Sequence, residues 1–334
     1  MVHGTASRPT FAHMPTGLVM RSTGSRYLVR GADGARHECV AKGNLRIKGW
    51  KSTNPLAVGD RVEFLPQLSA EEVGSIIDLH DRTNYLVRRS VNLSHHRHVL
   101  AANLDQALLM VTVLRPRTSF GFIDRFLVTA EAYNVPVVLV YNKVDDLDDE
   151  ERELLADHVD TYQRIGYRVV MTAALQGGGV QEVVDLLQGK VTLLSGHSGV
   201  GKSTLINTID PTLDLHTFEV SASSEKGQHT TTNAEMYELR MPDGGKSTTP
   251  TFIIDTPGIK GFGLVDLEKA DIGDQFPEFF ALKGECRFND CMHLEEPGCA
   301  VRAGLEAGTL AGTRYNSYVD MLNGVDDTST FRVD

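Results

Sequence analysis

Residues 196–203 read GHSGVGKS and match the pattern G-x-x-x-x-G-K-[ST] of a phosphate-binding loop. The apolar residues 191–195 (VTLLS) stand directly before the motif and predict the strand that such a loop follows. Backbone N–H groups of the loop would surround a β-phosphate, and the N-terminus of the next helix would add its dipole. Lys202 would neutralise the β- and γ-phosphates, which is a catalytic as well as a binding role, and Ser203 would bind Mg²⁺. The expected nucleotide contacts here are Gly196, His197, Ser198, Gly199, Val200, Gly201, Lys202, Ser203 and Thr204.

Strands and helices alternate on the N-terminal side of this loop. Apolar segments that predict buried strands are residues 107–114, 136–141, 168–172 and 191–195. Segments with helical character lie between them, at residues 122–127, 147–165 and 180–187. Such alternation is typical of an α/β domain, in which helices cover both faces of a parallel sheet.

The regions on either side of this domain have other patterns. Residues 17–79 contain short alternating segments with turns at 31–34 (GADG) and 58–60 (VGD), which predict a small β-barrel. Residues 84–104 are polar and basic and resemble a linker, and the chain beyond residue 262 is expected to be mainly helical.

Residues 142–145 read NKVD and follow the expected strand 136–141. The Asp145 carboxylate can accept hydrogen bonds from guanine N1–H and the 2-amino group, a pair of donors that adenine lacks. Lys143 would lay its stem across the base, and Asn142 would brace the loop or reach N7. Thr172 and Ala173, at the end of another strand, would meet guanine O6 through their backbone. The combination predicts GTP rather than ATP.

Residues 255–258 read DTPG after a further apolar strand, 251–254. Asp255 would hold the Mg²⁺ shell, and the backbone N–H of Gly258 would meet the γ-phosphate. Residues 230–232 offer a threonine for the same Mg²⁺, and we favour Thr231. Ras-like GTPases carry the phosphate loop first, then DxxG, then NKxD. Here NKVD comes first and DTPG last, so the sequence predicts a circular permutation that keeps the sheet and moves the chain ends.

Three of the four cysteines gather near one histidine. Cys286, Cys291, His293 and Cys299 supply three thiolates and one imidazole, a complete tetrahedral shell for one structural Zn²⁺. Three reduced cysteines beside an unrelated histidine are the alternative. We read no secretory signal or membrane span in the chain, so clustered cysteines favour metal over disulfides.

The net charge of −11 over 334 residues would by itself argue against nucleic acid. The charge is unevenly distributed, because residues 17–66 carry nine Lys or Arg against four Asp or Glu, whereas residues 145–160 carry nine acids. A basic face on the N-terminal barrel can therefore meet phosphate, and the acidic run is expected to be a solvated helix face.

With these motifs assembled, the chain resembles the ribosome small-subunit-dependent GTPase A family. The resemblance runs from about residue 17 to 322 and also includes AANLDQ (101–106), GQHTTT (227–232) and EPGCAV (296–301). The composition of the chain predicts a disordered tail (1–16) and a basic linker (81–104). The resemblance implies an OB-fold RNA-binding domain (17–80), a permuted GTPase domain (105–263) and a zinc-binding domain (264–334). It further implies a cytoplasmic, monomeric GTPase that binds the small ribosomal subunit and its 16S rRNA late in assembly, and that hydrolyses GTP to GDP with Mg²⁺ as it leaves.

Ile259 follows DTPG, where Ras-like proteins have a glutamine that orients water. The resemblance implies that His229 takes this catalytic role, although His229 could instead contact RNA. The main alternative function is an RNA-binding assembly factor that uses GTP only as an occupancy switch with negligible turnover. An ATPase or metabolite kinase is disfavoured by NKVD.

Overall fold

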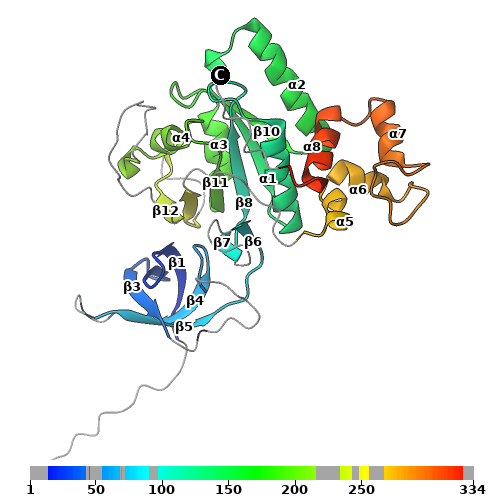
Figure 1. Cartoon of the computed structure of the whole chain (residues 1–334). Coiled ribbons are helices and arrows are strands. Elements are labelled where there is room, and N and C mark those ends of the chain that lie inside the picture. Colours follow the sequence, from blue (N-terminus) through cyan, green and yellow to red (C-terminus); the bar gives the residue numbers. More distant parts are fainter. Residues whose placement is uncertain are drawn as a thin grey trace, which may run out of the picture.

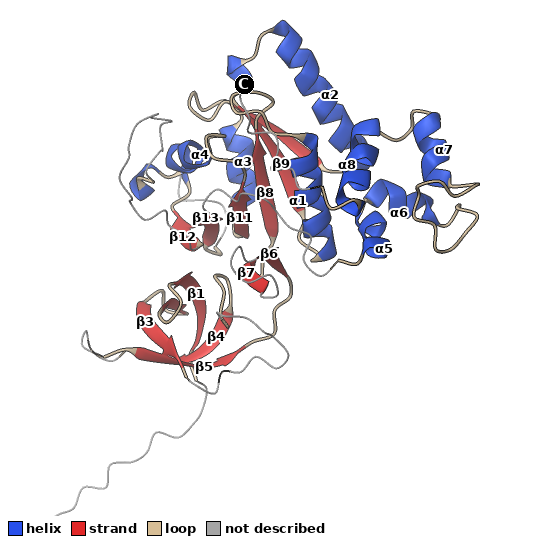
Figure 2. Cartoon of the chain, in the orientation of Figure 1, coloured by secondary structure: helices blue, strands red, loops and turns tan. Residues whose placement is uncertain are grey.

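The computed structural model describes residues 14–42, 45, 55–67, 69, 72–89, 97–215, 234–242, 248–255 and 267–325. Figure 1 shows a barrel at the N-terminal end of the chain, a central sheet and a set of helices at the C-terminal end. Figure 2 shows the same parts by secondary structure, with helices on both faces of the central sheet. Of the expected tail, residues 1–13 lie outside the described part, and the first strand begins at Thr16.

The N-terminal region is a closed five-stranded barrel, as predicted. Its strands are β1 (Thr16–Ser22), β2 (Tyr27–Gly31), β3 (Arg36–Ala41), β4 (Arg61–Leu65) and β5 (Gly74–Leu79). The barrel closes because β1 pairs with both β2 and β4, and β3 pairs with β5. Alternate residues point inward, and the interior is filled by the side chains of Val19, Tyr27, Val29, Cys39, Leu56, Val62, Phe64 and Ile76.

The segment expected as a linker contains a two-stranded antiparallel sheet, which corrects that expectation. Its strands are β6 (Tyr85–Arg89) and β7 (Arg97–Ala102). Leu86 and Ala101 are fully buried, because they join the core of the central sheet. The many basic and polar residues of this segment concealed the short apolar pattern of the strands.

The VGD turn of the barrel forms the junction with this small sheet. Val58 makes a β-bridge with Ala101, and Gly59 has a φ of 91°. A Cβ on Gly59 would lie 2.0 Å from the carbonyl oxygen of Ala102, so only glycine fits there. Asp60 is fully buried and its carboxylate accepts from Arg82 Nε at 2.7 Å.

The central sheet has the order β10-β9-β8-β11-β13-β12, and it is parallel except for β12. The bounds are β8 (Gln106–Val111), β9 (Val137–Asn142), β10 (Arg168–Thr172), β11 (Val191–Ser195), β12 (Glu235–Leu239) and β13 (Thr251–Asp255). Alternate residues of β8 face opposite sides: Leu109 packs with the helices of one face, and Leu108 with those of the other. The predicted α/β domain is thereby confirmed.

Among the described residues, four helices cover this sheet: α1 (Phe120–Ala132), α2 (Asp149–Ile165), α3 (Val180–Leu187) and α4 (Lys202–Ile209). The start of α1 is capped by Ser119, whose hydroxyl accepts from the N–H of Phe122. The start of α2 carries a capping box between Asp148 and Glu151, and Gly166 ends the helix in the left-handed region. The short 3-10 helices η1 (Val144–Asp146) and η2 (Pro211–Leu213) belong to its loops.

The C-terminal region is helical, as predicted, with α5 (Lys269–Ile272), η4 (Gly273–Gln275), α6 (Pro277–Lys283), α7 (Ala300–Glu306) and α8 (Gly312–Leu322). In Figure 1, α8 lies beside α1 of the central domain. Arg314 of α8 is fully buried between Asp124 of α1 and Glu278 of α6, with bonds of 2.7 Å to each carboxylate. Val128 of α1 completes the apolar core of the C-terminal helices.

The barrel and the central domain share one continuous sheet. Strand β1 pairs antiparallel with β12 at Arg21 and Glu235. Arg30 of β2 binds the Glu238 carboxylate of β12 through two bonds of 3.0 Å. Its guanidinium also lies 5.5 Å from the ring centroid of Phe252 on β13. Within the part of the chain that the structure describes, no helix has the length and apolar character needed to cross a membrane.

Candidate nucleotide and metal sites

Those of the predicted nucleotide residues that the structure describes lie at or directly after the carboxyl ends of β9, β10, β11 and β13. The strand order brings these loops together, because β8 and β9 lie on one side of β11 and β13 lies on the other. Ligands of open α/β sheets bind at this edge. Segments 142–145 and 196–204, which are more than fifty residues apart in the sequence, therefore become neighbours.

The phosphate loop has the backbone that its glycines predict. Gly196, Gly199 and Gly201 have φ values of 144°, 84° and 104°. A Cβ on Gly196 would lie 2.2 Å from the carbonyl oxygen of Met110 on β8, and one on Gly201 would lie 2.3 Å from Asn142 Nδ2. The loop is therefore pressed against the neighbouring strands, and its curvature leaves successive N–H groups available for an anion.

Lys202 opens α4 and bends back over the loop. Its Nζ donates to the carbonyl oxygens of Gly196 and His197, at 2.8 and 2.9 Å. Burial lowers the pKa of Lys202, and the negative charge of Asp255 opposes that shift. The ammonium group is thus held where phosphate oxygens could replace the two carbonyls. Phe122 of α1 lies against the His197 ring, with centroids 3.8 Å apart, a contact that the sequence did not reveal.

Asn142 connects three loops of the site. Its Oδ1 accepts from Thr172 Oγ1 at 2.9 Å and from the N–H of Ala174 at 3.0 Å, while its Nδ2 donates to the carbonyl of Val200 at 2.8 Å. Of the two roles expected for this side chain, the structure contains the bracing one. Thr172 contributes its hydroxyl, and the N–H of Ala173 donates to the carbonyl of Gly178.

Lys143 and Asp145 are held by two residues that the motif analysis missed. Lys143 has a φ of 62°, and its Nζ donates to the carbonyl oxygen of Arg115 at 2.8 Å. Asp145 is exposed, and its Oδ2 accepts from Gln176 Nε2 at 2.8 Å. No short motif contains Arg115 or Gln176, because each lies 28 to 31 residues from its partner.

Asp255 ends β13 opposite Leu194 of β11, so its carboxylate stands beside the phosphate loop. Ser203 and Thr204 follow Lys202 in the first turn of α4. The other predicted residues of the γ-phosphate and magnesium region, His229, Thr231, Gly258 and Ile259, lie outside the described residues. Their roles remain predictions.

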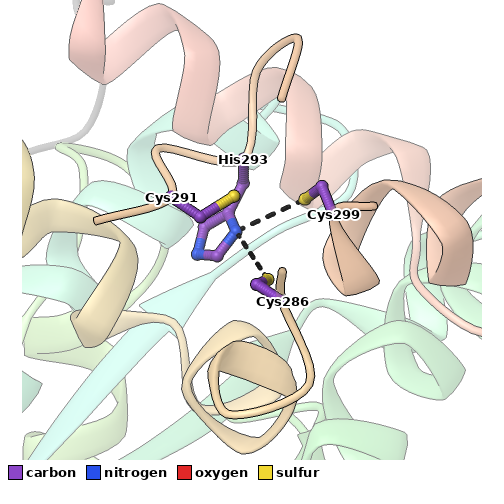
Figure 3. A group of neighbouring side chains, drawn as sticks. All are labelled: Cys286, Cys291, His293 and Cys299. Carbon is purple, nitrogen blue, oxygen red and sulfur yellow. Dashed lines mark hydrogen bonds between the residues drawn. The ribbon is translucent and has the colours of Figure 1, made fainter. Parts of the chain in front are cut away.

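The four predicted metal ligands come together, as Figure 3 shows. The ligand atoms of Cys286, Cys291, His293 and Cys299 all lie within 4.8 Å of one another. His293 Nδ1 is 3.7 Å from Cys286 Sγ and 3.5 Å from Cys299 Sγ. Burial raises the pKa of the Cys291 thiol to about 12, so thiolate at this position requires a cation nearby. Three sulfurs and one nitrogen fit a closed tetrahedral metal site.

The backbone around these ligands is fixed by side chains of its own region. Tyr315 and Tyr318 donate their hydroxyls to the carbonyls of His293 and Met292, at 2.8 and 2.6 Å. The Glu296 carboxylate accepts from the N–H groups of Met292 and Leu294, each at 2.8 Å. The four ligands are therefore held in place by surrounding hydrogen bonds, and the cluster can hold one metal ion.

Comparisons with known proteins agree with this geometry. The family model of the RsgA GTPase matches residues 79–265, and that of the RsgA N-terminal domain matches residues 16–76. The small ribosomal subunit biogenesis GTPase RsgA of Flavobacterium psychrophilum is 49% identical over 316 residues, which cover 94% of both chains. The protein of the same name from Bacteroides fragilis is 50% identical over 311 residues, or 93% of this chain and 97% of the relative.

Two solved structures have the same fold. YjeQ from Thermotoga maritima superposes with a TM-score of 0.73 at 32% identity, over 93% of this chain and 98% of that one. YloQ, described as a circularly permuted GTPase, superposes with a TM-score of 0.69 at 27% identity, over 96% and 98% of the two chains. The permuted order of the motifs is thus a property of the fold, and the chain belongs to the RsgA GTPase family.

Proposed function

We propose that the protein binds the small ribosomal subunit late in its assembly and hydrolyses GTP in a subunit-stimulated reaction coupled to its release. Hydrolysis of GTP follows from the family, and the names of its relatives support the subunit as target. The observation that carries the assignment of a single nucleotide site is Asn142, whose amide ties the NKVD loop to the phosphate loop and to the loop after β10. One ligand can therefore meet all three.

In this mechanism the chain's residues mainly position the nucleotide and stabilise its charge. Lys202 Nζ leaves the carbonyls of Gly196 and His197 and donates to oxygens of the β- and γ-phosphates. The N–H groups of residues 196–204 hold the β-phosphate. Asp145 accepts from the guanine N1–H and 2-amino group. Ser203, Thr231 and Asp255 would hold Mg²⁺, which would supply charge neutralisation at the phosphates. Gly258 meets the γ-phosphate and His229 orients the attacking water.

The Cys3His cluster holds one structural Zn²⁺ in this proposal. The donor set has no open position for water, and the surrounding hydrogen bonds serve the fold of the ligand loop. The barrel supplies the RNA-binding surface toward 16S rRNA, which the basic composition of residues 17–66 supports. The protein works as a monomer in the cytoplasm, where subunits are assembled.

The deciding experiment measures phosphate release from GTP with no ribosomal particle, with purified small subunits and with large subunits. We expect strong stimulation by small subunits only, and a fall of that stimulation as salt rises. Negligible rates in all three reactions would favour the alternative function, an RNA-binding factor that uses GTP only as an occupancy switch with negligible turnover. Ile259 is the observation that favours this alternative, because its side chain cannot orient water.

Guanine specificity is tested separately with Asp145→Asn. The variant loses the paired acceptor, so GTP binding should weaken by about 1–3 kcal/mol, because a buried donor of the base is left unpaired. Binding of GTP by the variant as tightly as by the parent would contradict the assignment of NKVD.

A further inference from the structure

The loop between β8 and α1 (residues 112–119) adjoins both halves of the candidate nucleotide site. It is closed by its own hydrogen bonds: the N–H of Thr112 donates to Thr118 Oγ1 at 3.2 Å, and the N–H of Thr118 donates to the Thr112 carbonyl at 3.0 Å. Pro116 lies beside the phosphate loop, since a Cβ on Gly199 would be 3.7 Å from Pro116 Cδ. The β8–α1 loop is therefore a braced element against which another segment can be fixed.

Arg115, in this loop, holds the segment that carries Asp145 at both of its ends. At the start of the segment, the Arg115 carbonyl accepts from Lys143 Nζ at 2.8 Å. At the other end, the guanidinium donates to Asp146 Oδ2 at 2.8 Å and to both carboxylate oxygens of Glu151, at 2.8 and 2.7 Å. The same guanidinium donates to the backbone carbonyl of Asp146. Asp145 lies between these anchored positions.

The bidentate contact between Arg115 and Glu151 fixes how the two side chains lie relative to each other. Glu151 is only 16% exposed, and its Oε2 also accepts from the N–H of Asp148 in the capping box of α2. The hydrogen bond from Arg115 lowers the pKa of Glu151 to about 2, so the pair stays charged at all working pH values. Because Arg115 itself is 48% exposed, the ion pair adds little to global stability. The planar Arg115 guanidinium, with its two hydrogen bonds to one carboxylate, instead fixes the position of the loop.

We propose that Arg115 is a positioning residue for guanine recognition. It holds the 143–146 segment at a fixed place relative to the phosphate loop, so that the Asp145 carboxylate meets the base while the phosphates occupy residues 196–204. The inference rests on the proposed function of this site as a guanine-nucleotide site. Arg115 does not touch the reacting atoms and acts through Lys143 and Asp145.

The test compares GTP with ITP, which lacks the 2-amino group that Asp145 would bind. In Arg115→Ala the Asp145 carboxylate is no longer held at a fixed position relative to the base. The Kd for GTP should therefore rise roughly tenfold, which is the equivalent of one charge-assisted hydrogen bond. The Kd for ITP should rise less, so the preference for GTP over ITP should shrink, by at most the same factor. In turnover assays KM should rise while kcat at saturating GTP stays near that of the parent, because the phosphate site is intact.

Two further variants separate positioning from folding. Glu151→Gln keeps an acceptor for the capping box but loses the charged fork, so it should shift the GTP to ITP ratio in the same direction, by less. Arg152→Ala removes an exposed arginine of α2 that pairs with Asp149 at 3.3 Å, and should leave the ratio at the parent value. Thermal melting of every variant shows whether the fold is kept.

The outcomes are distinct. A parental GTP to ITP ratio in both Arg115→Ala and Glu151→Gln, even with a lowered Tm, would overturn the inference and leave Arg115 as a stabilising surface residue. If the parent protein itself binds ATP as tightly as GTP, the proposed function fails instead.

Discussion

Replacing Arg314 by leucine should be among the most damaging single changes in the chain. Its guanidinium is fully buried, donates to Asp124 Oδ1 at 2.7 Å and binds both oxygens of Glu278, at 2.7 and 3.1 Å. Tyr162 donates to the same Asp124 oxygen at 2.8 Å. Burial raises the pKa of Asp124, and the charge of Arg314 opposes that shift.

The expected cost follows from what the substitution leaves behind. Arg314→Leu would bury the Asp124 charge without its counter-ion, and removing one partner of a buried pair costs about 3–5 kcal/mol of the free energy of unfolding. A domain is stable by only about 5–15 kcal/mol. Because the contact joins α8 to α1, the C-terminal helices should loosen from the central domain first.

Urea denaturation followed by far-UV circular dichroism measures this cost. The double variant Asp124→Asn/Arg314→Leu should cost less than the sum of the single variants, since the uncompensated charge is gone. Arg302→Ala is the matched control: its contact to Glu306 is exposed and 3.9 Å long, so its loss should change stability by under about 1 kcal/mol. A loss below about 1 kcal/mol for Arg314→Leu, or strict additivity in the double variant, would refute the reasoning.

Three further predictions concern metal, pH and catalysis. Freshly purified protein should contain about one zinc per chain by metal analysis, and chelation should unfold the C-terminal region while GTP still binds; protein without zinc would contradict the metal assignment. Burial lowers the pKa of His158 from 6.5 to about 4, so between these pH values the unfolded chain binds one proton more than the folded chain. The free energy of unfolding should therefore fall as the pH drops from 6.5 to 4, by at most about 1.4 kcal/mol per pH unit. His158→Gln should flatten this dependence in urea titrations at several pH values, and an unchanged slope would show that another group is responsible. His229→Ala should abolish most subunit-stimulated phosphate release with little effect on GTP affinity or subunit binding; loss of binding as well would make His229 an RNA contact.

The elements with strong local signals were predictable from the sequence. The strands at 168–172 and 191–195 and the helix at 180–187 have the bounds that their apolar patterns predict. The metal ligands were predictable as well, because the 14-residue stretch from Cys286 to Cys299 contains the whole donor set.

The missed features depend on contacts between distant residues. Arg314 and Asp124 are 190 positions apart, and Arg115 and Glu151 are 36 apart, so no local pattern contains either pair. Strands β6 and β7 were missed for another reason: their apolar runs are short and stand among arginines, histidines and asparagines that favour a linker. Burial of Leu86 and Ala101 against the central domain decides their structure.

The sheet that runs from β1 into β12 has a consequence for inheritance and for engineering. Arg30 and Glu238, and likewise Arg21 and Glu235, lie in different domains but make one interface. A substitution in either partner therefore removes a contact with a residue more than two hundred positions away. Barrels exchanged between relatives should therefore function only when β12 travels with them, so the unit that can be grafted is the barrel together with one strand of its neighbour.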